Sequence, residues 1–444
     1  MILNNADLVT FWDSEPFLKG TLVAIEGKII VDFGSVGKLA DRYHDTDTLD
    51  VGGRIVMPGL INAHTQLRRT LTRGMPIKGE QPRTFQEMQE ALCWSPDRAL
   101  SEEDVYLGTL VGLLDSVRAG VTTVIDHHSS PAVVPGCLDT AWQAFSEVGV
   151  RGALSYAVSD RDGSRVSQAG IEENRRFIKR CKAEGSEMMS ALFGLEASHA
   201  VSRRTLEQVV AAHSEVGGGF HVRVAEDRGD LETTRREYGA TPVARLAAAG
   251  VLNKGSLAVH CVHLEETDYR ELKASGVRAV VCPQSNAVSG VAGEGTAGLS
   301  RLRGAGVSTA VGTDGVTASV FEEFRTAALI QRVMGLPSSR AKREAFQATF
   351  SGNGLLATDL FGTTLGKIKP GARADLVVLD HQPATPLTVE NFADHFYFGM
   401  SRAPVYAVVI NGRLVFKQGV FPNLDESRIR ARARRAADAL WKRM

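Results

Sequence analysis

The sequence lacks the features of secreted, membrane-spanning and nucleic-acid-binding proteins. Its 444 residues carry 51 basic and 51 acidic side chains, and this zero net charge gives no attraction to nucleic acid or an anionic membrane. No apolar run approaches the roughly 18 residues of a membrane span, and the first twenty residues do not resemble a signal peptide. The five cysteines form no CxxC pair, which argues against a disulfide framework. We therefore expect a cytoplasmic protein without nucleic-acid or membrane partners.

Both ends of the chain are predicted to be rich in β-strands. The first 57 residues contain short strand-like runs around a Gly27-Lys28 turn. From about Lys369 the chain again contains strand-like segments, which are alternating or continuous apolar runs around an Asn411-Gly412 turn. The stretch 428–443 alternates Arg with Ala and Leu, which is typical of an amphipathic surface helix.

Between the two ends, eight apolar runs rich in β-branched residues recur at intervals long enough for a helix. They cover residues 55–64, 121–128, 150–158, 190–198, 219–227, 256–263, 277–286 and 307–315. Helix-like segments separate most of them, and several of these segments end in a glycine suited to a helix C-cap. Eight alternating units indicate a closed (β/α)₈ TIM barrel of the α/β class. A dinucleotide-binding sheet is disfavoured because no GxGxxG turn is present.

Polar side chains stand at the ends of most of the predicted barrel strands. In such barrels the carboxyl ends of the strands form the active site. The side chains concerned are His64, Gln66, His127, His128, Glu196, Arg223, Glu226, His260, Gln284, Ser285, Asn286 and Asp314. Cys261 and Cys282 also lie near strand ends, but a nucleophilic role would need a neighbouring base or cation that the sequence does not show. We expect a cleft at this end of the barrel.

Several motifs resemble the amidohydrolase superfamily. They are IVMPGLINAHTQL, the HVRVAE run of residues 221–226, VHCVHL, GTDG and KIKPGARADLVVLD. The resemblance is closest to the aminohydrolase and chlorohydrolase branch, and within it to the aminohydrolase of the SsnA type. It implies a β-sandwich domain built from residues 1–57 and 367–425, a barrel over residues 58–366 and a helix over 426–444. It also implies a small-molecule substrate, and leaves a homo-oligomer open.

The resemblance implies a catalytic metal site, and this chain departs from it. In the family one zinc or iron ion is held by an HxH pair, a His after the fifth strand and an Asp after the eighth. Here His64 and Asp314 match two of these ligands, whereas Gln66 and Arg223 stand at the other two. Gln is a poor zinc ligand, and Arg is not a ligand at all. His221 should lie about 6 to 7 Å deeper in the barrel than Arg223, and so should not replace the lost ligand.

The remaining family positions carry proton-handling groups. The resemblance makes Glu226 the acid/base and His260 the sixth-strand His, while Glu196 stands where relatives carry a His beside the substrate. With Asp314 freed from metal, we expect Glu226, His260 and Asp314 to be catalytic. His64, Gln66, His127, Glu196 and Arg223 are expected to bind substrate.

Three hypotheses follow for function. The first is a hydrolase of a carbon–nitrogen or related bond in a small, polar, cyclic substrate, with no bound metal and with Arg223 in place of the cation. The second is a metal-dependent aminohydrolase with rearranged ligands and one zinc or iron ion. The third is an inactive binding or regulatory subunit in which Arg223 and Asp314 form a structural ion pair. The cost of burying ionisable groups without a function favours an enzyme over the third hypothesis. We expect the first hypothesis rather than the second because Gln66 and Arg223 replace two of the ligands.

Overall fold

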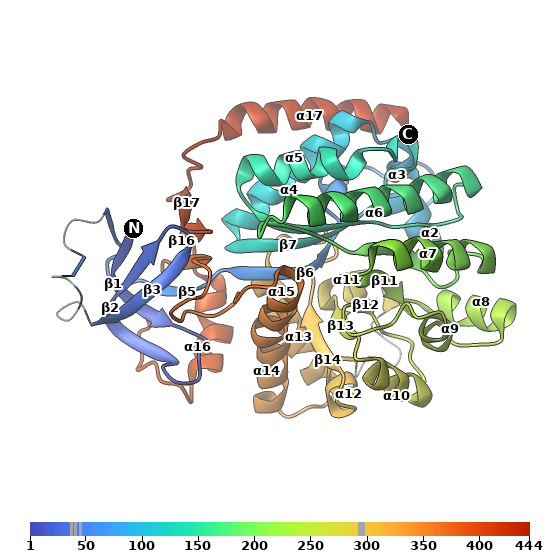
Figure 1. The fold of residues 1–444 in the computed structure, drawn as a ribbon. Helices are drawn as coiled ribbons and strands as arrows, with labels where there is room; N and C mark the ends of the chain where they lie inside the picture. Colours follow the sequence, from blue (N-terminus) through green and yellow to red (C-terminus); the bar gives the residue numbers. More distant parts are fainter. Residues whose placement is uncertain (36–38, 40–41, 44–46, 292–297) are drawn as a thin grey trace.

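The fold was analysed in a computed structural model, which describes residues 1–35, 39, 42–43, 47–291 and 298–444. A barrel of parallel strands surrounded by helices forms the larger part of the molecule, and a small sheet built from both ends of the chain lies beside it (Figure 1). Among the described residues, no helix is both long and apolar enough to cross a membrane.

The barrel has the predicted order of strands and helices. Its strands form two parallel sheets, β6-β7-β8-β9 and β10-β11-β12-β13-β14. A bridge between Val158 and Leu195 joins the sheets on one side, and the N–H groups of Thr313 and Asp314 donate to the carbonyl of His64 on the other. The barrel is therefore closed. Its strands are β6 (Leu60–Thr65), β7 (Val121–His128), β8 (Arg151–Tyr156), β9 (Met189–Ala191), β10 (Phe193–Ala197), β11 (Phe220–Val224), β12 (Leu257–His260), β13 (Arg278–Val281) and β14 (Ser308–Val311).

Two of the eight predicted runs are interrupted. The first divides at Gly59 into a strand of the small sheet and the first barrel strand, and a side chain at Gly59 would collide with Thr122. The fourth divides at Leu192 into β9 and β10, which belong to different sheets. An apolar run does not distinguish one strand from two, because both halves are buried.

Strands from both ends of the chain form one small sheet around a separate apolar core. Its order is β17-β16-β15-β5-β1-β2-β3, with β4 pairing with β1. The predicted turns meet there, since a side chain at Gly412 would collide with the carbonyl of Gly27. The strands are β1 (Ile2–Val9), β2 (Phe17–Glu26), β3 (Ile29–Ser35), β4 (Thr48–Asp50), β5 (Ile55–Pro58), β15 (Leu376–Leu379), β16 (Val405–Ile410) and β17 (Arg413–Lys417).

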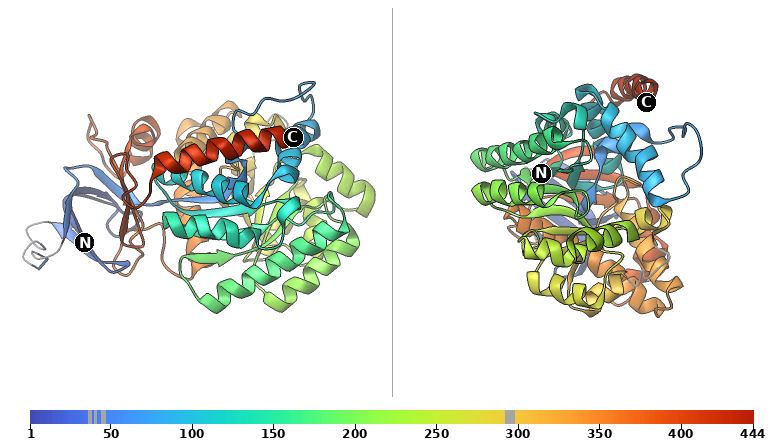
Figure 2. Two further views of the ribbon diagram at one scale, coloured as in Figure 1. Left: turned by 90° about the horizontal axis from the view of Figure 1, so that it is seen from above. Right: turned by 90° about the vertical axis from the view of Figure 1, so that its right-hand side faces the viewer.

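Helices cover the outside of the barrel, and the last helix, α17, packs along α4 (Figure 2). The described helices are α2 (Phe85–Gln89), α3 (Ser95–Ala99), α4 (Glu102–Arg118), α5 (Cys137–Val148), α6 (Ser164–Glu184), α7 (Arg203–Val216), α8 (Arg228–Tyr238), α9 (Pro242–Ala248), α10 (Glu266–Ser275), α11 (Pro283–Val288), α12 (Gly298–Gly304), α13 (Val320–Val333), α14 (Ser338–Phe346), α15 (Asn353–Phe361), α16 (Phe392–Phe398) and α17 (Glu426–Arg443), together with short 3₁₀ and π turns such as η1 (Leu67–Thr72).

A buried ion pair connects the barrel to the small sheet. Arg151 begins β8, its side chain is fully buried, and its guanidinium donates to both oxygens of Asp375 at 3.1 and 3.2 Å. Asp375 immediately precedes β15, and its Oδ1 also accepts the N–H of Asn411. These contacts fix the small sheet against the N-terminal end of the barrel strands. The active-site candidates lie at the opposite end of those strands.

Candidate active site

The carboxyl ends of the barrel strands bring the predicted residues together in a buried cluster. His64 is the second-last residue of β6, His260 is the last residue of β12, and Asp314 follows β14. All three are at most 2% exposed. His260 and Asp314 have positive φ angles of 71° and 51°, a conformation that costs free energy in residues other than glycine. Such strain is found where the surrounding structure holds a side chain in a required direction.

A chain of hydrogen bonds fixes the orientation of the His64 ring. The Ser155 hydroxyl lies 3.3 Å from the carbonyl of Asp126, which can only accept, and 3.1 Å from Nδ1 of His221. With the hydroxyl donating to the carbonyl, its oxygen accepts from Nδ1–H of His221. Nε2 of His221 then accepts from Nδ1–H of His64 at 2.7 Å. The remaining nitrogen of His64, Nε2, is left with a lone pair 3.1 Å from Oδ1 of Asp314.

The ring of His260 is oriented in the same way. Its Nδ1 lies 2.8 Å from Oδ1 of Asn286, an acceptor, so Nδ1 carries the proton. Its Nε2 is buried and has no hydrogen-bond partner among the described residues. Oε1 of Glu226 lies 3.5 Å from this nitrogen. A second lone pair therefore points at a second carboxylate.

Asp314 is held as an anion by several donors. Its Oδ1 accepts from Nε2 of Gln66 at 2.5 Å, and its Oδ2 accepts from the hydroxyl of Ser285 at 2.6 Å. Arg69 lies 3.6 Å from Oδ2. Burial acts to raise the pKa of Asp314, but its contact with His64 and nearby positive charge, including that of Arg69, outweigh burial, so the pKa lies well below its ordinary value.

Glu226 has the opposite electrostatic environment. Burial raises the pKa of Glu226 above its ordinary value, although His260 and Arg223 act to lower it. Two carboxylates of one site are thus separated in pKa, with Asp314 the stronger acid. This separation is typical of sites in which one carboxylate stays charged and the other carries a proton.

Arg223 contacts Glu196 and Glu226, the carboxylates on either side of it. Its Nη1 donates to Oε2 of Glu226 at 3.0 Å, and its Nη2 donates to Oε1 of Glu196. Glu196 also lies 3.3 Å from Arg161. Burial acts to raise the pKa of Glu196, but the charge of Arg223 outweighs it and lowers the pKa to about 2. The third hypothesis placed Arg223 in a structural ion pair with Asp314, but the described ion pairs of Arg223 are with these two glutamates.

A pocket of about 450 Å³ opens beside these ion pairs. Glu196, Arg223, Glu226, Trp94 and Arg161 are among the residues that line it. The guanidinium of Arg161 lies 4.7 Å from the centre of the Trp94 ring. The pocket therefore joins the cluster of buried titratable groups to a wall with an aromatic face and positive charge.

The two adjacent histidines of β7 point in different directions. The His127 ring lies 4.5 Å from that of His221 and 5.7 Å from that of His64, measured between ring centres. His128 instead contacts Ser130 at 3.0 Å, and burial lowers its pKa to about 3. Of the two, His127 belongs to the cluster, but it is not among the residues that line the pocket.

Several residues of the cluster have no role assigned by the sequence. Ser285 and Asn286 follow a predicted strand, which is the signal that could have found them. Ser155 lies within a strand, and Trp94 and Arg161 lie in a π turn and a loop between strands, where no periodic pattern marks them. Their contributions depend on the three-dimensional arrangement.

The donors in the cluster fit a divalent cation. Burial lowers the pKa of His64, so its ring is neutral. The lone pair of His64 faces Asp314 and that of His260 faces Glu226, so each pair of acceptors needs either a proton or a cation between its two atoms. One divalent cation would serve both pairs. Ligand atoms of Glu226, His260 and Asp314 lie within 4.8 Å of one another, as the ligands of one ion do. Imidazole and carboxylate are ordinary zinc ligands.

Comparisons with known proteins identify the family. A sequence profile described as the Amidohydrolase family matches residues 55–415. The 5-methylthioadenosine/S-adenosylhomocysteine deaminase of Pelotomaculum thermopropionicum is 31% identical over 450 residues, covering 98% of both chains. The 5'-deoxyadenosine deaminase of Methanosarcina mazei is 28% identical over 451 residues, covering 100% of this chain and 99% of the relative.

Solved structures share the fold. An adenosine deaminase from Xanthomonas campestris with bound zinc superposes with a TM-score of 0.86 at 23% identity, covering 99% of this chain and 98% of that chain. Atrazine chlorohydrolase from Arthrobacter aurescens, complexed with zinc, gives 0.81 at 20% identity, covering 98% and 99%.

These findings correct one expectation. The prediction of a hydrolase without metal, with Arg223 replacing the cation, is wrong: the relatives are named as deaminases, and the solved neighbours hold zinc. The physical reason is that the charge of Arg223 is already neutralised by Glu196 and Glu226, while Nε2 of His64 faces Asp314 and Nε2 of His260 has no hydrogen-bond partner among the described residues. The predicted fold and enzyme class are confirmed: the chain belongs to the amidohydrolase family, and it is a hydrolase that acts on carbon–nitrogen bonds.

Proposed function

We propose that the protein is a metal-dependent aminohydrolase that releases ammonia from an amino group on a small nitrogen heterocycle. The observation that carries this proposal is the convergence of two imidazole lone pairs and two carboxylates in one buried cluster at the barrel mouth. The relatives supply the substrate class, since their names specify adenosine derivatives modified at the 5' position.

In this proposal His64, His260 and Asp314 hold the cation. A bound divalent ion would lower the pKa of a water molecule and polarise the carbon that carries the amino group. The protein orients these ligands through hydrogen bonds to their far sides, from His221 to His64 and from Asn286 to His260. Such partners fix the ring tautomer and direct the free nitrogen toward the ion.

Glu226 is the proposed proton carrier. Its raised pKa and its position beside His260 suit a carboxyl that takes a proton from water and gives it to the leaving amine. Arg223 holds one oxygen of Glu226 and leaves the other facing the cluster. The pocket beside it would receive the substrate, with Trp94 offering an aromatic face to a heterocycle and Glu196 and Arg161 offering polar contacts.

The test combines metal analysis with an ammonia-release assay. Protein stripped with a chelator and reloaded with zinc should release ammonia from 5'-methylthioadenosine, S-adenosylhomocysteine or 5'-deoxyadenosine, and the stripped protein should not. Glu226→Gln should still bind metal but lose about 10²- to 10⁴-fold in kcat, the usual contribution of acid–base catalysis. Metal-independent ammonia release, or undiminished activity of Glu226→Gln, would contradict the proposal.

The predicted cytoplasmic location, the homo-oligomer and the domain boundaries at residues 57, 366 and 425 remain part of this proposal. A sedimentation experiment on the full chain measures the oligomeric state. The substrate contacts assigned to Gln66, Glu196 and Arg223 can be measured through KM in the corresponding alanine variants.

A further inference from the structure

We propose that Cys282 is a ligand of the catalytic cation and supplies, as a thiolate, one of the two coordination positions lost at Gln66 and Arg223. This inference rests on the proposed metal-dependent function. It differs from the histidine and aspartate ligand set that the family resemblance implies.

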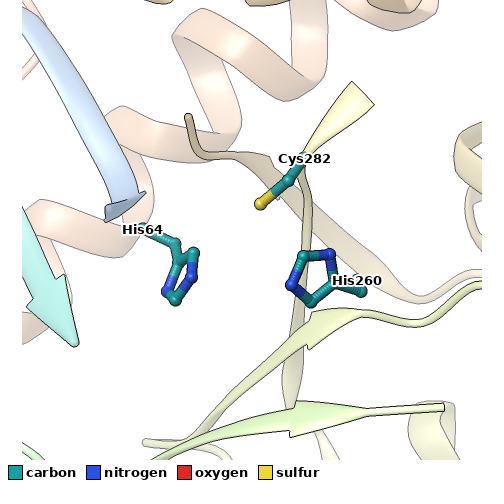
Figure 3. A group of neighbouring side chains, drawn as sticks. All are labelled: His64, His260 and Cys282. Atoms are coloured by element: carbon teal, nitrogen blue, oxygen red, sulfur yellow. The ribbon is translucent and has the colours of Figure 1, made fainter. Parts of the chain in front are cut away.

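Cys282 lies at the mouth of the barrel, directly after β13. Its Sγ and one ring nitrogen each of His64 and His260 lie within 4.8 Å of one another, and all three residues are buried. Figure 3 shows the sulfur of Cys282 pointing into the space between the two imidazole rings. Nε2 of His64 faces Asp314, and Nε2 of His260 has no hydrogen-bond partner among the described residues.

The fold explains why this sulfur points inward. Val280 and Cys282 belong to the same apolar cluster inside the barrel, as expected for residues two positions apart along a strand. Cys282 therefore faces the barrel interior like Val280, but it lies two residues nearer the carboxyl end of the strand, where the active-site candidates are. Because α11 begins at Pro283, the backbone of Cys282 is held between the strand and the helix.

Neither of the replaced positions can supply the missing ligand in this arrangement. Nε2 of Gln66 donates to Asp314, so the amide of Gln66 acts as a donor toward the cluster. Arg223 is committed to Glu196 and Glu226. Among the described residues, Cys282 is the side chain that forms a possible metal-binding group with both His64 and His260.

A thiolate also satisfies the charge of the site. Zinc binds cysteine sulfur, imidazole nitrogen and carboxylate oxygen readily, with a Zn–S distance of about 2.3 Å. Two neutral imidazoles, the carboxylate of Asp314 and the thiolate of Cys282 would together balance the charge of a divalent ion in this buried site.

Cobalt replacement tests the inference without relying on activity. Protein loaded with one equivalent of Co²⁺ should show the near-ultraviolet charge-transfer band of a cobalt–sulfur bond. Cys282→Ala and Cys282→Ser should lose this band, and their metal affinity should fall by about 100-fold or more, since even partners behind the ligands contribute 10- to 100-fold.

Cys261→Ala is the matched control. Cys261 is buried and adjacent to His260, but its thiol donates to the carbonyl of Ala258. This variant should keep both the band and the affinity. If it loses the band as well, or if Cys282→Ala keeps it, the inference is overturned.

X-ray absorption at the zinc edge of the unaltered protein covers the case in which the Cys282 variants do not fold. One sulfur at about 2.3 Å from zinc supports the inference. A site with one equivalent of zinc and only nitrogen and oxygen neighbours overturns it and leaves the proposed aminohydrolase standing. A protein that binds neither zinc nor cobalt overturns the inference and the proposed function together.

Discussion

Glu323 on α13 should make the stability of the protein depend on pH in a defined way. Its side chain is fully buried, and one carboxyl oxygen accepts the N–H of Gln284 at 3.0 Å. The other oxygen has no hydrogen-bond partner among the described residues. Burial raises the pKa of Glu323 from 4.5 to about 8, and the charge of Asp314 acts in the same direction. The folded protein therefore favours the protonated form near neutral pH.

The magnitude follows from the two pKa values. The unfolded chain loses the proton near pH 4.5, whereas the folded chain keeps it until about pH 8. Between these values the free energy of unfolding should fall by about 1.4 kcal/mol for each pH unit, to a total of about 5 kcal/mol as an upper limit. The cost is absent below pH 4.5 and complete above pH 8. Replacement by Gln, which cannot ionise, removes it.

Denaturant unfolding of the parent and Glu323→Gln between pH 5 and 9 measures this difference. The free energy of unfolding of the variant should exceed that of the parent by an amount that rises with pH and levels off above about pH 8. Glu322→Gln is the matched control, because Glu322 is the exposed neighbour on the same helix. A difference between variant and parent that stays constant with pH would refute the reasoning.

Two further predictions concern buried ion pairs. Asp375→Ala leaves the guanidinium of Arg151 buried without its partner and should reduce the free energy of unfolding by about 3–5 kcal/mol, as measured by denaturant unfolding; a loss below 1 kcal/mol would show that water replaces the carboxylate. Glu196→Gln removes one of the two carboxylates that neutralise Arg223 and should weaken zinc binding by about tenfold, equivalent to about 1.4 kcal/mol. Competition with a chromogenic chelator measures this change, and unaltered affinity would contradict it.

The barrel could be predicted because its strands leave a regular trace in the sequence. Each strand is a short, buried, β-branched run, and the helices between the strands carry caps that follow local rules. The breaks at Gly59 and Leu192 could not be predicted in this way. They depend on which sheet each half of a run joins, and this is decided by contacts between residues far apart in the chain.

The candidate site was predictable as a set of residues but not as a set of contacts. The ends of the strands identify His64, His260 and Asp314 because the barrel geometry places strand ends at one mouth. The sequence does not reveal that Arg223 faces Glu196 and Glu226, since ion pairs depend on side-chain directions. The wrong expectation of a metal-free site came from the loss of two ligand positions at Gln66 and Arg223 and from placing the charge of Arg223 where the cation should sit.

The proposed site suggests how an arginine can occupy a former ligand position beside a cation. Two carboxylates surround the guanidinium of Arg223, so its charge is screened from the cluster formed by His64, His260 and Asp314. The same contacts fix Glu226, because the oxygen that Arg223 does not hold is the one that faces His260. An arginine at a ligand position is thus compatible with metal-dependent chemistry under two conditions: a nearby carboxylate neutralises its charge, and another side chain supplies the lost ligand. Glu196 meets the first condition through its ion pair with Arg223. Cys282 is the residue that we propose for the second.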